Sequence, residues 1–350
     1  MLASLQAAVG AHSPQRMLII KPSALGDVAT TLPLLCDLKT LFPESRIDWL
    51  IHPALADLVR GHDALHELIY FDREKLGRAL ISGDVRGHLR TLIRTLRHNQ
   101  YDIVFDAQGL LRSAVLARLS GASIRIGFAD AREGARFLYT HYSHLSRNKE
   151  LAVVRMRSLA GVLAPPRDTV EFRLPVQAVA RAKIRTLADT GQKFAAVIPG
   201  ARWDAKRWSE KGYAQIVRHL AKSALRVLVL GAMSERTLCQ GIVEQSQVAA
   251  LNLAGHTSLA EMIAALDLCQ VVIGNDSGPL HVAAALGRPL VGLYGPTDPA
   301  SVGPFGQMDH VLRFLQPGGY KNSGSENRDA TLQSLTVEMV WHKIQTLLNP

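Results

Sequence analysis

The segment GNDSGPLH, residues 274–281, follows an apolar run and opens a helical pattern. Gly278 lets the backbone approach a ligand closely, and the free N–H groups of a helix start can hold an anion. His281 lies in the first turn, where it can add a donor to a phosphate oxygen. Asp276 and Ser277 can point into the same site. The alternative is an ordinary helix cap, since Asp and Ser begin many helices that bind nothing.

The segment PGARWDAKRW, residues 199–208, leaves another apolar run. A lysine on such a loop, beside a helix-start anion site, is a good counter-ion for a diphosphate, so Lys206 is a candidate ligand-binding residue. The alternative is a solvated Lys206 with tryptophans that only pack. Glu235 follows the next strand, where a carboxylate commonly binds ribose hydroxyls. A favourable charge at a helix N-terminus explains Glu235 equally well.

The segment KPSALGD, residues 21–27, holds the equivalent place after the first apolar run. Asp27 would start a helix, and capping is one explanation of it. A carboxylate at a strand end also faces the ligand side of a sheet, where it can act as a general base. Both interpretations remain open for Asp27.

Basic side chains gather in the first half of the chain. Arg86, Arg90, Arg94 and Arg97 fall within about 80° of arc on a helix, and apolar residues fill the neighbouring arc. Such a face is usually just solvated. Because the excess lies in the half without the anion-binding segment, it suggests that a second, acceptor substrate is anionic.

Alternating strands and helices must position these segments. The first half has strand candidates at 18–20, 47–51, 67–71, 102–105 and 124–127, and the helix after the first strand is expected over 28–41. The second half has strand candidates at 195–198, 226–230, 251–253, 271–273 and 290–293. Strands separated by helices form parallel sheets, and ligands bind beyond the carboxyl ends of the strands.

We therefore predict an α/β protein with two Rossmann-like parallel-sheet domains facing across a cleft. The expected divisions are a tail at 1–16, an N-terminal domain at 17–175, a C-terminal domain at 176–335 and a last helix at 336–350. The N-terminal domain is a candidate packing partner for that helix. A loop rich in Gly, Ser and Asn is expected at 316–329. The tail lacks the pattern of a signal peptide.

Composition excludes several classes of protein. The chain has 350 residues, 47% of them hydrophobic, and no apolar run long enough to span a membrane. Its three cysteines, Cys36, Cys239 and Cys269, lie far apart, which fits a reducing, cytoplasmic setting. A formal charge of +10 points to an anionic partner. The sequence has no GxGxxG at a strand end, P-loop, HExxH or Asp-x-Asp, so nicotinamide, P-loop, zinc and metal–diphosphate chemistry are disfavoured.

Several motifs, taken in order, resemble a known family. KPSALGD, DAQGLLRS (106–113), PGA with KRW (206–208), GNDSGPLH and YGPTDP (294–299) are similar to those of the ADP-heptose:lipopolysaccharide heptosyltransferases. These are inverting glycosyltransferases of family 9 with the GT-B fold. The match covers almost the whole chain from Met17. The shorter segments at 130–133 and 152–157 are most similar to the subgroup that adds the first heptose to Kdo on lipid A.

The resemblance implies roles for particular residues. Asp27 is then the base that takes the acceptor hydroxyl proton, and a single displacement inverts the anomeric carbon. The donor diphosphate is bound by Lys206, Asp276, Ser277, Gly278 and His281. The nucleoside is bound by Glu235 and by Thr257, which stands where some relatives have Met near the adenine. The acceptor is bound by Arg86, Arg90, Arg112, Arg132 and Arg155.

The implied partners are an ADP-heptose donor, an anionic acceptor of the Kdo-lipid A type and the cytoplasmic surface of the inner membrane. No cofactor, metal ion or nucleic acid is expected. Three alternatives stay open: the same fold with another nucleotide sugar or a later core acceptor, a nucleotide-sugar 2-epimerase, and a basic nucleic-acid-binding protein.

Overall fold

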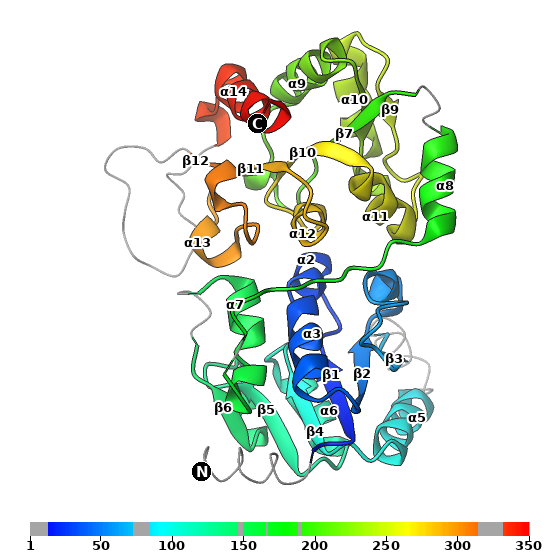
Figure 1. Ribbon diagram of the computed structural model, residues 1–350, viewed down its shortest axis with the longest axis vertical. Coiled ribbons are helices and arrows are strands. Elements are labelled where there is room, and N and C mark those ends of the chain that lie inside the picture. Colours follow the sequence, from blue (N-terminus) through cyan, green and yellow to red (C-terminus); the bar gives the residue numbers. More distant parts are fainter. Residues whose placement is uncertain are drawn as a thin grey trace. The chain divides into compact units, whose positions relative to one another are not determined.

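Figure 1 shows the computed structural model, whose chain divides into two compact units, Met1–Pro175 and Val176–Pro350. The structure describes residues 13–72, 85–145, 150–165, 167–187, 191–313 and 332–349. The side chains of residues 85, 86 and 88 are not among those described. The loop expected at 316–329 and residues 1–12 of the expected tail lie outside the described residues.

The N-terminal unit is built on a six-stranded parallel sheet with the order β3-β2-β1-β4-β5-β6. Its strands are β1 (Arg16–Ile20), β2 (Arg46–Ile51), β3 (Glu67–Tyr70), β4 (Ile103–Asp106), β5 (Ile124–Phe128) and β6 (His141–Ser143). Its helices are α2 (Leu25–Ala29), α3 (Leu32–Leu41), α5 (Val85–His98), α6 (Leu111–Leu119) and α7 (Ala152–Arg157), with short 3₁₀ turns η1 (Pro53–Leu58), η2 (Ala135–Leu138) and η3 (Ala160–Val162). Residues 17–20 of β1 are fully buried, because helices cover both faces of a parallel sheet.

The helix predicted over 28–41 is broken into α2 and α3. Proline in a helix lacks an N–H and clashes with the carbonyl four residues earlier. Pro33 would meet the carbonyl of Ala29, so α2 ends at Ala29 and Pro33 takes a first-turn position in α3. The break leaves a short first helix that carries Asp27.

The expected tail ends before residue 16. Strand β1 begins at Arg16, and the N–H of Gln15 donates to Asp102 Oδ2 at 2.7 Å. The Oγ of Ser45 donates to the carbonyl of Pro14. Residues 14–16 are therefore part of the folded N-terminal unit.

The C-terminal unit repeats this architecture with a second six-stranded parallel sheet, ordered β12-β11-β10-β7-β8-β9. Its strands are β7 (Lys193–Ile198), β8 (Leu225–Val229), β9 (Leu251–Asn252), β10 (Cys269–Asn275), β11 (Leu290–Tyr294) and β12 (Val311–Arg313). Its helices are α8 (Ala178–Leu187), α9 (Glu210–Lys222), α10 (Arg236–Ser246), α11 (Leu259–Asp267), α12 (Gly278–Ala285), α13 (Pro299–Val302) and α14 (Val337–Leu348), with turns η4 (Asp204–Lys206), η5 (Met233–Glu235), η6 (Met308–His310) and η7 (Leu332–Ser334).

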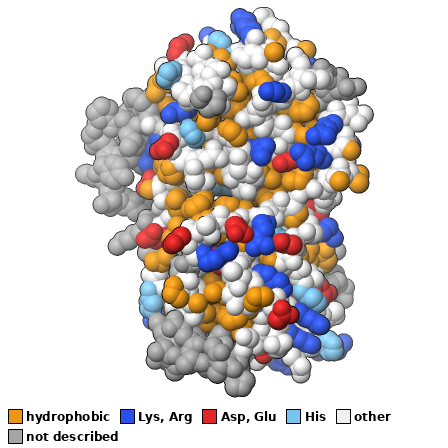
Figure 2. Space-filling model, in the orientation of Figure 1, with side chains coloured by type: hydrophobic (Ala, Val, Ile, Leu, Met, Phe, Trp, Pro, Cys, Tyr) orange, Lys and Arg blue, Asp and Glu red, His pale blue; other side chains and the backbone are white. Residues whose placement is uncertain are grey.

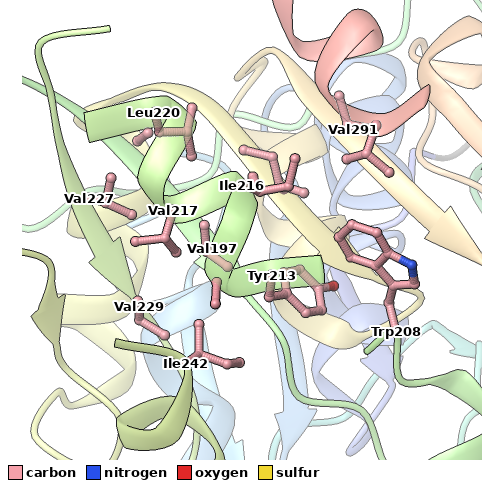
Figure 3. Packing of buried hydrophobic residues seen from close by; sticks show 14 of the residues in the cluster. Val197, Trp208, Tyr213, Ile216, Val217, Leu220, Val227, Val229, Ile242 and Val291 are labelled. Atoms are coloured by element: carbon pink, nitrogen blue, oxygen red, sulfur yellow. The ribbon is translucent and has the colours of Figure 1, made fainter. Parts of the chain in front are cut away.

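Helix α9 shows how periodicity builds the core of this unit. Tyr213, Ile216, Val217 and Leu220 recur at helical spacing, and all are fully buried against β7 and β8 (Figure 3). Trp208 packs edge-to-face on Tyr213 with ring centroids 5.2 Å apart. The apolar stripe thereby fixes the loop that ends in Trp208.

Helix α14 also belongs to the C-terminal unit. It packs on α9, β10 and β11, and its residues Val340 and Ile344 are fully buried in the core of that unit. The indole N–H of Trp208 donates to the carbonyl of Leu335, just before the helix, at 2.9 Å. These contacts make α14 part of the core of the C-terminal unit.

The two sheets have the same topology. In each, the first strand pairs in parallel with both the second and the fourth strand of its unit, so the strand order reverses beside the first strand. Crevices for ligands form at such switch points, beyond the carboxyl ends of the strands. The switch points are the ends of β1 and β4 in the N-terminal unit, and of β7 and β10 in the C-terminal unit.

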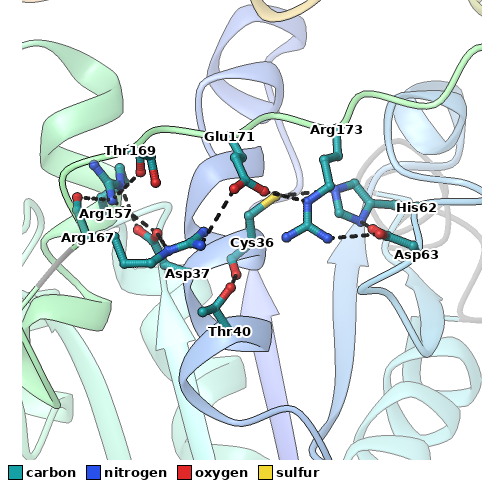
Figure 4. Close-up of polar contacts among 10 residues, drawn as sticks. All are labelled: Cys36, Asp37, Thr40, His62, Asp63, Arg157, Arg167, Thr169, Glu171 and Arg173. Atoms are coloured by element: carbon teal, nitrogen blue, oxygen red, sulfur yellow. Dashed lines mark hydrogen bonds and ion pairs between the residues drawn. The ribbon is translucent and has the colours of Figure 1, made fainter.

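Residues 167–175, which lead out of the N-terminal unit, are held by buried charges (Figure 4). Arg157 of α7 forms a bidentate pair with Asp37 of α3, at 2.6 and 3.1 Å. The same guanidinium donates to the carbonyls of Arg167 and Thr169. Since both side chains are buried, removing either partner would leave an uncompensated charge.

Candidate active site

The end of β10 and the loop after β7 are joined by Asn275, which is fully buried. Its Nδ2 donates to the carbonyl of Pro199 at 2.7 Å, and its Oδ1 accepts from the N–H of Trp208 at 3.2 Å. One side chain therefore holds both ends of the 199–208 loop to the end of β10. The loop brings Lys206 to the start of α12.

Asp276 is the centre of a polar cluster at this switch point. Its Oδ2 lies 2.7 Å from Lys206 Nζ and accepts from Thr297 Oγ1 at 2.5 Å, while its Oδ1 lies 3.9 Å from His281 Nε2. The Asp276 side chain is 8% exposed. Burial raises the pKa of this carboxyl, but the contacts with His281, Lys206 and Thr297 outweigh burial and lower the pKa to about 2. The carboxylate therefore stays ionised and holds Lys206 in place.

The start of α12 carries polar atoms that no described protein group satisfies. Ser277 is the N-cap residue, yet its hydroxyl makes no capping hydrogen bond. Its Oγ and the Nδ1 of His281 are buried and lack a hydrogen-bond partner among the described residues. Buried polar atoms are seldom left so, and the N–H groups of a helix start favour an anion. A phosphate group fits this donor set.

Two further turns of the C-terminal unit lie side by side. The N–H of Gly255 donates to the carbonyl of Gly231. Gly255 also lies close to Met233, since a Cβ added to Gly255 would be 2.8 Å from the Met233 sulfur. These turns carry Thr257, which is half-buried, and Glu235, whose Oε2 accepts from the N–H of Ala232 at 2.8 Å.

The carboxylate of Glu235 also lies over the end of β7. A Cβ on Gly200 would be 2.0 Å from Glu235 Oε1, so a larger residue there would displace the Glu235 carboxylate. The PGA motif is thus explained by a close approach to Glu235.

Asp27 lies at the other switch point, in α2 just beyond β1. Its side chain is 56% exposed. Its Oδ2 accepts from the N–H of Ala24 at 3.4 Å and lies 3.6 Å from Lys21 Nζ. The carbonyl of Asp27 accepts from the hydroxyls of Thr30 and Thr31, which fixes the backbone of the helix.

The neighbouring turn, after β4, is organised by Asp106. Its Oδ1 accepts from the N–H groups of Gln108 and Gly109, and its Oδ2 accepts from the hydroxyl of Tyr139 at 2.6 Å. Burial raises the pKa of this fully buried carboxyl. The DAQG segment is therefore a structural turn that supports the end of β1 and starts α6.

The arginines expected to bind an acceptor fall into different settings. Arg112 on α6, Arg132 before η2 and Arg90 on α5 are exposed, whereas the side chain of Arg86 lies outside the described residues. In Figure 2 basic side chains lie at the lower right, where Figure 1 places α5. Leu96 of α5 is fully buried on the opposite arc, as the amphipathic pattern predicts.

Arg155 differs from these arginines. It is 6% exposed, forms a bidentate pair with Asp130 at 3.0 and 2.5 Å, and its guanidinium carbon lies 3.9 Å from the centre of the Phe128 ring. Its positive charge is paired with Asp130 inside the N-terminal unit. We therefore do not retain Arg155 among the acceptor-facing residues.

Reasoning from the sequence missed three residues of these sites: Lys21, Asn275 and Thr297. Each belongs to a motif that the sequence does show, KPSALGD, GNDSGPLH or YGPTDP. A lysine at the end of a buried strand is the one unusual signal, because lysine is rarely buried without a partner.

No helix in the described ranges is both long and apolar enough to cross a membrane.

Comparisons with known proteins point to one family. A model of the family described as glycosyltransferase family 9 (heptosyltransferase) matches residues 89–330. Lipopolysaccharide heptosyltransferase 1 of Escherichia coli strain K12 is 28% identical over 327 residues, covering 92% of this chain and 99% of that protein. Lipooligosaccharide heptosyltransferase 2 of Haemophilus ducreyi is 28% identical over 367 residues, covering 95% of this chain and 99% of that protein.

Among solved structures, E. coli heptosyltransferase WaaC with ADP has a TM-score of 0.76 and 28% identity, and covers 95% of this chain and 100% of its own. This similarity, with the topology of the two sheets, confirms the predicted GT-B class of two Rossmann-like parallel-sheet domains.

Proposed function

Since the chain belongs to glycosyltransferase family 9, the heptosyltransferase family, we propose that this glycosyltransferase moves heptose from ADP-heptose to the Kdo-lipid A inner core of lipopolysaccharide. The observation that supports the donor is the set of unsatisfied donors at the start of α12, Ser277 Oγ and His281 Nδ1, beside Lys206. In the proposed complex these groups bind the diphosphate. The positive charge of Lys206 stabilises the negative charge that grows on the departing ADP.

The nucleoside is assigned to the two adjacent turns. Glu235 accepts from the ribose hydroxyls, and Thr257 lies on the turn nearest the base. The solved structure of E. coli heptosyltransferase WaaC holds ADP, which supports an adenine nucleoside by similarity.

Asp27 is the proposed base. It takes the proton of the acceptor hydroxyl as that oxygen attacks the anomeric carbon of heptose. The bond from this carbon to the diphosphate oxygen breaks, and its electron pair leaves with ADP. One displacement inverts the configuration, so no second carboxylate nucleophile is needed. The exposure of the Asp27 side chain, 56%, supports this role because a base must reach the substrate.

Arg90, Arg112 and Arg132, together with Arg86, are proposed to bind the anionic acceptor. We place the enzyme in the cytoplasm, peripheral to the inner face of the inner membrane and held there by charge. Such contact weakens as salt rises. The relatives named as heptosyltransferases 1 and 2 make a later, already heptosylated core acceptor the second candidate.

The experiment measures ADP release from ADP-heptose by the full chain, with and without Kdo-lipid A. Release that needs this acceptor, and that vanishes in Asp27→Ala, supports both the reaction and the base. Release only with a heptosylated core would favour the second candidate. An epimerase would convert a nucleotide sugar without any acceptor. No nucleotide release with any donor, combined with salt-dependent binding to random duplex DNA, would favour a nucleic-acid-binding protein.

A further inference from the structure

Lys21 is a lysine buried at the first switch point. It is 4% exposed and directly follows β1, between the end of β2 and the turn after β4. Burying an ammonium group is costly unless it is paired and hydrogen-bonded. Lys21 Nζ donates to the carbonyl of Ala107 at 3.1 Å and lies 3.6 Å from Asp27 Oδ2.

The backbone of Lys21 is fixed on both sides. Its N–H donates to the carbonyl of Leu50 at 3.2 Å, and its carbonyl accepts from the indole N–H of Trp49 at 3.1 Å. Trp49 is fully buried in β2. The backbone of Lys21 is therefore held to β2 at two points, and its ammonium group is held to the turn after β4 at one. The ammonium group lies next to a carboxylate on a short helix.

The two oxygens of Asp27 are not equivalent. Oδ2 receives both contacts, from Lys21 Nζ and from the N–H of Ala24. Oδ1 accepts no hydrogen bond from the described residues. A carboxylate anchored at one oxygen keeps the other oriented toward solvent, where an acceptor hydroxyl arrives.

We propose that Lys21 is a positioning residue that anchors Asp27 through Oδ2 and leaves Oδ1 as the atom that takes the acceptor proton. This inference rests on the proposed function, since it assigns a role within the same reaction. The proton passes from the acceptor hydroxyl to Oδ1 as the new glycosidic bond forms, and ADP carries away the electrons of the broken bond. Lys21 itself exchanges no proton and touches no substrate.

The test compares kcat and ADP affinity of Lys21→Met, Asp27→Asn and the double variant, using ADP-heptose and Kdo-lipid A. Misplacing a catalytic group by about 1 Å can cost on the order of 100-fold in rate. We expect Lys21→Met to lose about 10- to 100-fold in kcat and to keep the dissociation constant of ADP. In the Asp27→Asn background the same substitution should change the residual rate less than twofold, because its effect passes through Asp27.

Lys21→Arg should recover part of kcat, since it keeps the charge and changes its geometry. Lys39→Met is the matched control: Lys39 lies on α3, half-buried, and donates to the carbonyl of Ser45. We expect it to leave kcat unchanged. Should Lys21→Met fail to fold, Lys21→Gln keeps a donor for the Ala107 carbonyl and removes only the charge.

An unchanged kcat in Lys21→Met, or a loss of equal size in the Asp27→Asn background, would overturn the positioning role. These outcomes differ from a failure of the proposed function. If Asp27→Asn keeps its kcat, Asp27 is not the base. If the wild type transfers no heptose, the proposed reaction is wrong.

Discussion

Each switch point of this protein pairs a lysine with an aspartate, yet the two pairs are arranged in opposite ways. In the N-terminal unit the lysine is buried and the aspartate is 56% exposed, with Lys21 Nζ and Asp27 Oδ2 3.6 Å apart. In the C-terminal unit Asp276 is buried at 8% exposure, and Lys206 Nζ lies 2.7 Å from it. Thr297 and His281 also contact the Asp276 carboxylate.

This difference separates two uses of one residue type. The exposed side chain of Asp27 meets the requirement for the proposed general base, because the substrate must reach a base. A carboxylate that holds cations in place must be surrounded and stay ionised, which describes Asp276. Both aspartates lie at a switch point, Asp27 after the first strand of its unit and Asp276 after the fourth strand of the other. Burial and neighbouring groups therefore decide the role of each.

The strongest test of this contrast is Asp27→Asn. Removing a general base typically costs about 10²- to 10⁴-fold in rate. We expect kcat to fall by that factor while the dissociation constant of ADP, measured by calorimetry, stays within twofold of the wild type. A large loss of ADP affinity would place Asp27 in donor binding and erase the contrast.

The next test is Lys206→Ala, which removes the cation that Asp276 holds. Hydrogen bonds to charged groups contribute about 1.5–3 kcal/mol, so ADP affinity should fall about tenfold or more, together with kcat. Lys211→Ala, on the exposed start of α9, serves as the control. Equal effects of the two substitutions on ADP binding would contradict the assignment of Lys206.

The third test is the stability of the C-terminal unit at low pH, which depends on Asp276. The pKa of Asp276 is lowered from 3.8 to about 2, so this group contributes stability that is fully present above about pH 4. That contribution, about 2 kcal/mol, is lost as the pH falls toward 2.

Urea unfolding of the wild type and Asp276→Asn, followed by tryptophan fluorescence, measures this effect. The difference in unfolding free energy between them should shrink by about 2 kcal/mol from pH 5 to pH 2. Asp204→Asn removes an exposed carboxylate of the 199–208 loop and should stay close to the wild type at pH 5. A difference that is constant with pH would show that Asp276 is not held ionised by its neighbours.

The smallest effect is expected from the exposed arginines of α5. Replacing Arg90 and Arg94 by glutamine should raise KM for Kdo-lipid A about threefold at low salt, and less at high salt, because exposed charges are screened. Donor KM should not change. The control is Arg185→Gln, on α8 of the other unit, which is equally exposed. A matching rise in that variant would mean that the charge effect is not specific to the N-terminal unit.

Some strands and helices could be predicted from the sequence, and others could not. The predicted strands of both sheets exist, with ends shifted by a residue or two, because parallel strands buried on both faces form apolar runs that are visible in the sequence. Strands β6 and β12 were missed, since each has three residues and most of their positions are only half-buried. The single helix expected after β1 was wrong because the effect of Pro33 on the preceding turn was not weighed.

The sequence by itself determined the two α/β halves, the parallel sheets and the motifs at the strand ends, since all of these follow from local periodicity and turn chemistry. It placed Asp276 and His281 in one motif and Lys206 in another, but it did not give the contacts between them. Only the tertiary structure brought these residues around one carboxylate, used Arg155 for an internal ion pair, and buried Lys21 behind Asp27. Exposure and pairing depend on groups 70 or more residues away in the chain, as for Lys206 and Asp276, and no local pattern encodes them.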